Sequence, residues 1–390
     1  MAGFMAIRAG SYRATIEAPP EILASLQVAF RDLVPPAPPA GDPGAQIVVH
    51  VRGDAFVITV DGVQWSQPDV QSPVDQLVYA LMRATLDAEP GLLHVHAGLV
   101  SWRGRGALIA GVPGSGKSTL ITRLVDAGFD YLTDERVGID PDLRLRPVPK
   151  PISLTTAAPE ALAGLDVTRS GRGVASDRLW HVAASDVRPG SVVSTTTLGA
   201  IVFVQYQPGA PLLTTEVHPA TAARRLLADS PDAVRFGPDA VVVAARLCAA
   251  HRCAHMLFGT GDDAVDALRS ITGSTTAPSA AAPVEALGTR APAGGRTFVP
   301  PAIAPDSVLE LARGVSGASV DGRCVLMRHA TGEVIELDPV DSAWLQLLDG
   351  RATLTEIVAE VAAANAMEEP PVMATAAASL RTLAEIGVVE

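Results

Sequence analysis

The chain has 390 residues, of which 48% are hydrophobic, and its formal net charge is −12 at pH 7. Because single cores usually stop growing at about 250–300 residues, this length predicts two or three domains. The negative charge argues against a broad nucleic-acid or anionic-membrane surface, since both need basic patches. Three cysteines leave one unpaired in any disulfide scheme and favour a reducing compartment. With neither a signal-peptide pattern nor an apolar run of about 18 residues, we expect a cytoplasmic protein that does not span a membrane.

Residues 1–90 are expected to form a small α/β unit. Ile47–Val51 and Ala55–Val60 have the composition of strands on either side of a turn. The proline-rich segment 35–44 predicts a loop, because proline removes a backbone donor and fixes φ. Apolar residues at helical spacing predict a helix over Val74–Asp87.

A pattern of strand, loop, helix and strand begins near residue 92 and predicts a second α/β domain over residues 91–272. The strands expected in it cover residues 94–102, 107–110, 129–133 and 200–205. A helix is expected from about Lys117 to Ala127, because Gly128 is placed to end it.

The last part of the chain is expected to be a linker followed by a small module. Residues 273–305 are rich in Ala, Pro, Gly, Ser and Thr without periodicity, which predicts a flexible or partly extended linker. In residues 306–390 the expected elements are strands at 323–328 and 333–337 and helices at 339–348, 353–364 and 371–386. Two strands and three short helices suit a winged-helix-like module.

The octapeptide Gly111–Ser118 reads Gly-Val-Pro-Gly-Ser-Gly-Lys-Ser and fits the phosphate-binding loop G-x-x-x-x-G-K-[ST] at every fixed position. Glycines let successive backbone N–H groups turn toward phosphate oxygens, and the following helix directs its N-terminal dipole at the same anion. Lys117 is placed to reach the β- and γ-phosphates, and the Ser118 hydroxyl to bind Mg²⁺. ATP is expected because neither lysine of the chain lies in an Asn-Lys-x-Asp guanine signature. The residues expected to bind ATP are Gly111, Pro113, Gly114, Ser115, Gly116, Lys117, Ser118 and Thr119.

An acidic pair, Asp134 and Glu135, follows the strand predicted at 129–133. In a strand–helix–strand unit of a parallel sheet the crossover is right-handed, and both strands end at the edge where ligands bind. The pair should therefore face the γ-phosphate. One carboxylate can hold Mg²⁺ while the other accepts a proton from an incoming hydroxyl. The alternative is a solvated turn.

His96 is expected at the mouth of the loop. With a turn centred on Gly104, antiparallel pairing sets residue 96 opposite residue 112, and His94 lies on the same face. His96 can then act as an acid, a base or an orienting group, and the alternative is a core histidine.

Three further features of the sequence each allow two interpretations. Lys150, between two prolines, either faces the site and stabilises phosphate charge or is a surface lysine. The arginine-bearing stretch 168–173 is either a lid or a surface loop. The cluster Cys248, His251, Cys253 and His255 lacks the usual spacing of paired zinc ligands, so buried thiols are the default.

These residues resemble a known family. His96-Ala97-Gly98, the loop and the acidic pair look like the core of HPr kinase/phosphorylase, whose fold resembles the nucleotide domain of phosphoenolpyruvate carboxykinase. The resemblance implies that Asp134 deprotonates the serine substrate, that His96 lies nearby, and that Glu135 stands where the family has a second aspartate. The family's later Glu-x-Arg-Gly signature has no counterpart, so phosphorylase activity is not implied. Together with the loop pattern, this makes Asp134, His96 and Lys117 the predicted catalytic residues and Ser118 and Glu135 the predicted Mg²⁺ ligands.

The C-terminal module resembles a second family. The stretch Gly332–Val358 and the ending Leu380–Val389 look like PqqD, with Leu337, Trp344, Leu348 and Gly350 as the recognisable positions. PqqD-like domains bind the leader segment of ribosomally made precursor peptides, which adds a strand to an exposed sheet edge.

The expected fold class is therefore α/β: a P-loop, HPr-kinase-like core with a small N-terminal α/β unit and a C-terminal winged-helix-like PqqD domain. The two resemblances together predict an ATP- and Mg²⁺-dependent kinase that phosphorylates a Ser or Thr hydroxyl of a ribosomally synthesised precursor peptide in natural-product (RiPP) biosynthesis. The alternatives are a small-molecule kinase with a regulatory tail and an ATP-gated chaperone for the precursor. No nucleic-acid partner is expected, and a homo-oligomer is compatible with the sequence.

Overall fold

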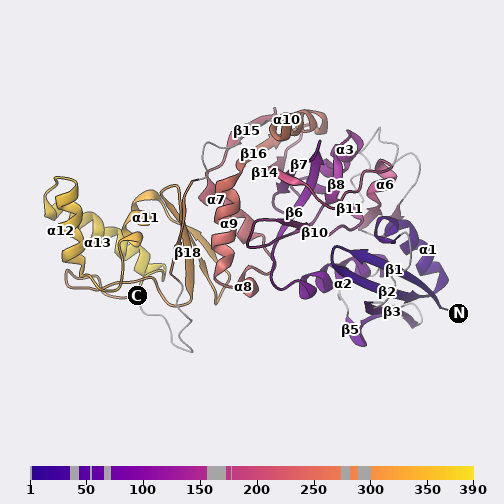
Figure 1. Cartoon of the computed structure of the whole chain (residues 1–390), viewed down its shortest axis with the longest axis horizontal. Coiled ribbons are helices and arrows are strands. Elements are labelled where there is room, and N and C mark those ends of the chain that lie inside the picture. The colour runs from indigo at the N-terminus through magenta and orange to yellow at the C-terminus, as the bar shows by residue number, and fades with distance from the viewer. Residues whose placement is uncertain are drawn as a thin grey trace. The chain divides into compact units, whose positions relative to one another are not determined.

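The computed structural model describes residues 2–35, 44–52, 55–65, 72–155, 173–176, 178–273, 282–288 and 300–390 (Figure 1). The chain divides into two compact units, residues 1–216 with 252–277, and residues 217–251 with 278–390. This division differs from the domain boundaries expected at residues 90, 272 and 305. No helix in the described ranges is long and apolar enough to cross a membrane.

The first unit begins with a five-stranded sheet in which the strands follow chain order. Its elements are β1 (Gly3–Ala9), β2 (Tyr12–Ala18), α1 (Pro20–Ala29), η1 (Arg31–Leu33), β3 (Ala45–Arg52), β4 (Ala55–Val60), β5 (Val63–Trp65) and α2 (Pro73–Ala88). The strands predicted at 47–51 and 55–60 and the helix predicted at 74–87 are confirmed. Apolar faces of the sheet and of α1 and α2 share one core, which holds α2 in place.

The larger sheet of the first unit has eight strands in the order β10-β9-β6-β7-β14-β16-β15, and β8 pairs with β6. Its strands are β6 (Leu93–Trp102), β7 (Arg105–Ala110), β8 (Asp130–Thr133), β9 (Arg136–Ile139), β10 (Leu145–Pro147), β14 (Thr197–Tyr206), β15 (Leu213–Glu216) and β16 (Arg252–Phe258). The helices α3 (Lys117–Asp126), α6 (Ala184–Val187) and α10 (Gly261–Gly273) belong to this part, as does a small sheet of β11 (Ile152–Thr155), β12 (Val174–Ala175) and β13 (Leu179–Val182).

The glycine-rich loop and the acidic pair meet at one edge of the larger sheet because of its strand directions. β7 and β8 both pair antiparallel with β6, so they run parallel to each other with β6 between them. The sequence predicted the shared edge correctly but not the strand inserted between the two. Gly98 of β6 lets α3 lie close to the sheet, because a Cβ there would lie 2.2 Å from Ile121 Cδ1.

The β6–β7 hairpin differs from the predicted register by one residue. Both residues of the turn Arg103–Gly104 have positive φ, as in a type I′ turn, and this centres the hairpin between them rather than on Gly104. The expected pairing of residues 96 and 112 is therefore wrong. His96 pairs instead with Arg136 of β9.

The second unit contains an antiparallel sheet in the order β17-β18-β19-β20. Its elements are α7 (Pro219–Ala228), α8 (Ala233–Phe236), α9 (Asp239–Ala250), β17 (Val284–Leu287), β18 (Val315–Val320), β19 (Arg323–Arg328), β20 (Val334–Glu336), α11 (Pro339–Gln346), α12 (Leu354–Ala364) and α13 (Glu369–Glu385). The two predicted strands and three predicted helices are confirmed within two residues at their ends.

Two features of the second unit were not predicted. The segment 273–305 is not only a linker, because β17 pairs along β18 and supplies an edge strand. Helices α7 and α9, which the sequence assigned to the preceding domain, contact this sheet, and all six residues of β18 are buried. Two strands thus become four, with α11–α13 sharing a core with β18 and β19.

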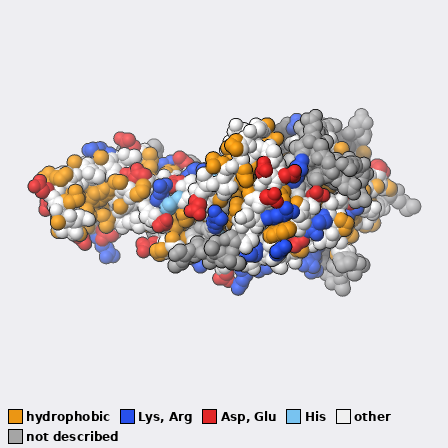
Figure 2. All heavy atoms as spheres, turned by 90° about the horizontal axis from the view of Figure 1, so that it is seen from above, with side chains coloured by type: hydrophobic (Ala, Val, Ile, Leu, Met, Phe, Trp, Pro, Cys, Tyr) orange, Lys and Arg blue, Asp and Glu red, His pale blue; other side chains and the backbone are white. Residues whose placement is uncertain are grey.

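On the face shown in Figure 2, acidic and basic side chains are interspersed over the described residues. The cysteines Cys248, Cys253 and Cys324 are buried free thiols.

Candidate active site

The glycine-rich loop joins β7 to α3 and is shaped by residues with positive φ. Gly114 and Gly116 have φ of 82° and 89°, a region that favours glycine. Gly116 is the N-cap of α3, so the first N–H groups of this helix face the loop. Lys117 is buried, and its Nζ donates to the carbonyl oxygens of Gly111 and Val112. In this state the ammonium group lies folded back on the loop.

The acidic pair is held in a turn that Thr133 stabilises. The Thr133 hydroxyl donates to the Val148 carbonyl at 2.7 Å and accepts from the backbone N–H of Glu135 at 3.3 Å. These bonds fix the backbone between β8 and β9, and so they fix the direction in which Asp134 and Glu135 leave the sheet.

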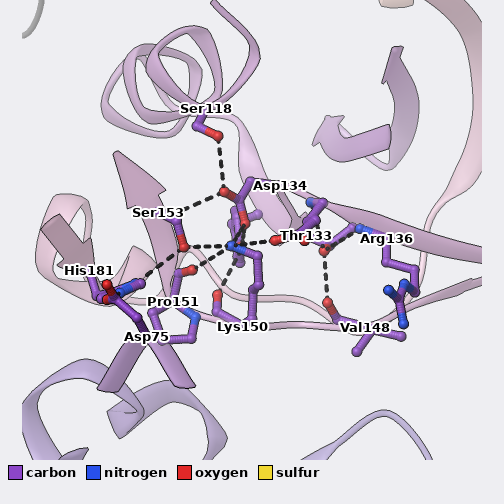
Figure 3. Close-up of polar contacts among 12 residues, drawn as sticks. Asp75, Ser118, Thr133, Asp134, Arg136, Val148, Lys150, Pro151, Ser153 and His181 are labelled. Carbon is purple, nitrogen blue, oxygen red and sulfur yellow. Dashed lines mark hydrogen bonds and ion pairs between the residues drawn. The ribbon is translucent and has the colours of Figure 1, made fainter. Parts of the chain in front are cut away.

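Asp134 is almost fully buried, and both of its carboxylate oxygens are engaged (Figure 3). Oδ2 lies 3.2 Å from Ser118 Oγ and 3.2 Å from the backbone N of Ser153. Oδ1 lies 2.9 Å from Lys150 Nζ and 3.1 Å from the Tyr131 hydroxyl. The carboxylate therefore links the end of the glycine-rich loop to the strand β11.

Lys150 faces the site, which is the first of the two interpretations that the sequence left open. Its side chain is fully buried, with Nζ 2.9 Å from Asp134 Oδ1 and 3.1 Å from Glu135 Oε2. The same nitrogen donates to the Pro151 carbonyl at 3.0 Å and to Ser153 Oγ at 2.9 Å. One cation thus compensates two carboxylates in a buried position.

The pKa values of this cluster follow from the pairing. Burial would lower the pKa of Lys150, but the adjacent Asp134 and Glu135 raise it above its ordinary value. Burial would raise the pKa of Glu135, but Lys150 and His96 hold it below its ordinary value. Burial and the Asp134 charge raise the pKa of Tyr131 well above its usual range. At neutral pH the cluster therefore contains a charged lysine, a charged Glu135 and a neutral tyrosine.

The predicted catalytic residues share one cavity of about 430 Å³. His96, Lys117, Ser118, Asp134 and Glu135 all line it. His94 is different, because it is fully buried and its Nε2 lies 3.4 Å from the Glu89 carbonyl. Of the residues expected to bind ATP, Pro113, Gly114, Gly116 and Thr119 also line this cavity.

Three polar residues of the cavity were missed by the sequence reasoning. Ser153 Oγ lies 3.2 Å from His181 Nδ1, and His181 Nε2 lies 2.5 Å from Asp75 Oδ1. Asp75 also accepts from Ser176 Oγ at 2.9 Å. These residues come from α2, β11, β13 and the turn before β13, so no local spacing connects them. A serine next to the Pro-Lys-Pro segment was the only available signal.

A second cavity, of about 260 Å³, adjoins the first, and Gly116, Thr119 and Tyr206 line both. Gly116, Thr119 and Arg123 line it from α3, and Tyr206 and Phe258 from the ends of β14 and β16. The two aromatic rings have centroids 5.5 Å apart. Gly116 has no room for a side chain, because a Cβ would lie 2.9 Å from Tyr206 Cβ.

Two weaker sequence signals give no site here. Of the stretch 168–173, only Gly173 lies within the described residues. Cys248 lies on α9 and Cys253 on β16, and among the described residues no group of three or more His, Cys, Asp or Glu side chains is placed to hold a metal ion.

The C-terminal residues give a family match. Residues 323–389, from β19 to the residues after α13, match the family described as Coenzyme PQQ synthesis protein D (PqqD). This part of the chain is a PqqD domain. Leu337 and Trp344, two of the positions on which the resemblance was based, lie in the core of this PqqD domain.

Two solved structures are similar to parts of the chain. TbiB1 in complex with the TbiA(beta) leader peptide is 30% identical over 21% of this chain and 94% of that chain, with a TM-score of 0.20. The HPr(Ser) kinase/phosphatase from Coxiella burnetii is 13% identical over 46% of this chain and 92% of that chain, with a TM-score of 0.25. No curated protein matches the chain.

Proposed function

We propose that this protein is an ATP-dependent phosphotransferase that phosphorylates a Ser or Thr hydroxyl of a ribosomally synthesised precursor peptide, whose leader segment binds the PqqD domain. The observation that carries the proposal is the 3.2 Å contact between Ser118 Oγ and Asp134 Oδ2. It places the hydroxyl that follows the loop lysine beside a buried carboxylate, in a cavity that Lys117, Glu135 and His96 also line. The PqqD domain in the same chain supplies the substrate class.

The donor set fits Mg²⁺ and a nucleotide triphosphate. The Ser118 hydroxyl and the Glu135 carboxylate are hard oxygen ligands, which suit Mg²⁺. Residues 111–119 offer glycine N–H groups, a helix N-terminus without an acidic residue in its first turn, and a lysine. Ser115 Oγ is buried without a hydrogen-bond partner among the described residues, so this loop still has unused polar capacity. When bound, Mg²⁺ would neutralise charge on the phosphates.

The second cavity suits the base of the nucleotide. It adjoins the glycine-rich loop at Gly116 and Thr119, and it presents the rings of Tyr206 and Phe258. A flat heteroaromatic base stacks favourably on aromatic side chains. We therefore assign the phosphates to the loop and the base to this aromatic pocket.

Asp134 is the proposed base of the transfer. The acceptor oxygen forms a bond to the γ-phosphorus of ATP, the bond from that phosphorus to the β–γ bridging oxygen breaks, and ADP leaves. The proton of the acceptor hydroxyl goes to Asp134. All four close contacts of this carboxylate are made within the protein, so one of them must break before Asp134 can accept a proton. The contact with Ser118 would break if that hydroxyl bound Mg²⁺ instead.

Lys150 has a separate part in this proposal. Its ammonium group balances the buried Asp134 carboxylate and the partly exposed Glu135 carboxylate. It therefore favours the ionised form of Glu135, which a metal ligand requires.

Leader binding follows the strand-addition mode of peptide recognition. The outer strands of the PqqD-domain sheet are β17 and β20, and β20 lies within the family match. β17 comes from outside the match, so this chain already covers the β18 side of the sheet with its own segment. The β20 edge is the proposed leader site.

The proposal is tested with a peptide encoded by a short reading frame beside this gene, supplied as full precursor, leader alone and core alone. With ATP and Mg²⁺, the full precursor should gain one phosphoryl group, the core should react far more slowly, and the leader should only bind. Asp134→Asn should still bind ATP and precursor but lose transfer. Phosphorylation of a free metabolite but not of the precursor would favour the small-molecule kinase. ATP and precursor binding, with no phosphate transfer to precursor or metabolite, would favour the chaperone.

A further inference from the structure

The cavity that contains Asp134 has a second end, away from the glycine-rich loop. Contacts run from Ser118 to Asp134, from Asp134 to Ser153, and on through His181 to Asp75. Figure 3 shows Ser118 and Asp75 at opposite ends of this chain of contacts, with Asp134 between them. The end near Asp75 is built by α2 and β13, and not by the loop.

Apolar and aromatic side chains line this second end beside the polar ones. Val78 and Tyr79 follow Asp75 by three and four residues on α2, so they lie on the same helix face, and both line the cavity. Leu179 and Thr155 line it from the paired ends of β13 and β11. Tyr79 is 39% exposed although it is a large aromatic residue.

The wall is held rigidly by buried polar bonds. Both oxygens of Asp75 are engaged, by His181 Nε2 and by Ser176 Oγ. Asp75 and His181 are buried, and the bond between them ties α2 to β13. With Asp75 engaged in this way, Val78 and Tyr79 are the apolar residues that α2 offers to a ligand.

The direction of phosphoryl transfer decides what this end binds. The attacking and leaving oxygens lie roughly in line on opposite sides of the transferred phosphorus. With the nucleotide on residues 111–119, the attacking hydroxyl must approach Asp134 from the end lined by α2. We propose that α2 and β13 form the acceptor subsite, where Tyr79 and Leu179 contact the peptide segment that carries the hydroxyl and favour an apolar residue beside it. This inference rests on the proposed function and names the substrate class of the same site.

The test compares the two ends of the cavity by steady-state kinetics of the full-length protein with the precursor described above. Tyr79→Ala should raise the KM for the precursor about tenfold, the size expected for one lost apolar contact, and leave the KM for ATP within about twofold. Tyr79→Phe keeps the ring and should match the wild type. Tyr206→Ala, at the nucleotide end where the two cavities meet, should raise the KM for ATP more than the KM for the precursor. Replacing the apolar neighbour of the acceptor residue by Asp should raise KM for the wild type and have little effect on Tyr79→Ala.

Several results would overturn the acceptor subsite. In the first, Tyr79→Ala leaves the KM for the precursor unchanged. In the second, it raises the KM for ATP and not the KM for the precursor. In the third, Tyr79→Phe raises the KM for the precursor as much as Tyr79→Ala does. Thermal unfolding shows whether Tyr79→Ala is still folded. Its Tm should stay close to that of the wild type, because an exposed side chain contributes little to stability. If the wild type transfers no phosphate, the proposed function fails, and titration of fluorescent core peptide in the presence of ADP still tests the subsite. Binding weakened in Tyr79→Ala supports it, whereas equal or absent binding in the wild type and the variant overturns it.

Discussion

Replacing Lys150 by methionine should destabilise the protein strongly. Methionine keeps most of the side-chain volume but removes the only cation that contacts both Asp134 and Glu135 in the described structure. Removing one partner of a buried ion pair costs about 3–5 kcal/mol, because the other partner is left charged and desolvated. Here one ammonium group with a fully buried side chain contacts the buried Asp134 at 2.9 Å and the partly exposed Glu135 at 3.1 Å, so a loss within that range is expected.

The assay is calorimetry of thermal unfolding at pH 7. For a unit of 150–250 residues, each kcal/mol shifts Tm by about 2–4 °C, so Lys150→Met should lower Tm by about 6–20 °C. Arg144→Met is the matched control, because Arg144 pairs with Asp142 at 3.1 Å but both side chains are about 70% exposed. An exposed pair contributes at most about 1 kcal/mol.

The pH dependence adds a second check on the reasoning. In the wild type the pKa of Glu135 is lowered by Lys150, so this contribution to stability is present above the unfolded-state pKa and is lost as pH falls through the folded-state value. Without the lysine, burial raises the pKa of Glu135, and the variant gains stability as this carboxylate takes up a proton. The difference in the free energy of unfolding between the wild type and the variant should therefore decrease as the pH is lowered from 7 to about 5. A Lys150→Met variant as stable as Arg144→Met, or a deficit that does not change with pH, would refute the argument.

Three further predictions concern other parts of the molecule. Gly98→Val should lower the free energy of unfolding by about 1–3 kcal/mol in denaturant titration, because the valine side chain would clash with Ile121. A loss below about 0.5 kcal/mol would mean that α3 can move away from the sheet. Ser118→Ala should weaken Mg²⁺-dependent ATP binding in calorimetric titration more than binding without metal, and an equal effect on both would exclude Ser118 as a metal ligand. Burial alone would raise the pKa of Glu336, but hydrogen bonds from Thr221 and two arginines lower it. Glu336→Gln should therefore destabilise the protein at neutral pH, and the loss of stability should become smaller as the pH falls below 4.5. A pH-independent cost, measured by chemical unfolding, would contradict that assignment.

The loop and the acidic pair could be predicted from the sequence because both depend on local rules. The G-x-x-x-x-G-K-[ST] spacing and Gly128 fix where β7 ends and where α3 begins and ends. Strand direction then places Asp134 at the same edge, whatever strand lies between. The one-residue error at His96 came from the turn, since residues 103 and 104 share the centre of a type I′ hairpin.

The acceptor end of the cavity could not be predicted in the same way. Asp75, Ser153 and His181 are far apart in the sequence and meet only because the core shared by α2 and the first sheet holds that helix beside β13. Asp75 also stands in the first turn of α2, where an acidic residue is ordinary and indicates no further role. β17 was missed because its four residues lie in a stretch whose composition is that of a linker.

The central claim is that the cavity and the PqqD domain act on one precursor peptide. Its most direct test is the mass of the precursor after incubation with the full-length protein, ATP and Mg²⁺, compared with the core peptide lacking its leader. The account predicts one added phosphoryl group on a Ser or Thr of the full precursor, lost in Asp134→Asn and much slower without the leader. An unmodified precursor, or transfer that is equally fast with and without the leader, would contradict it.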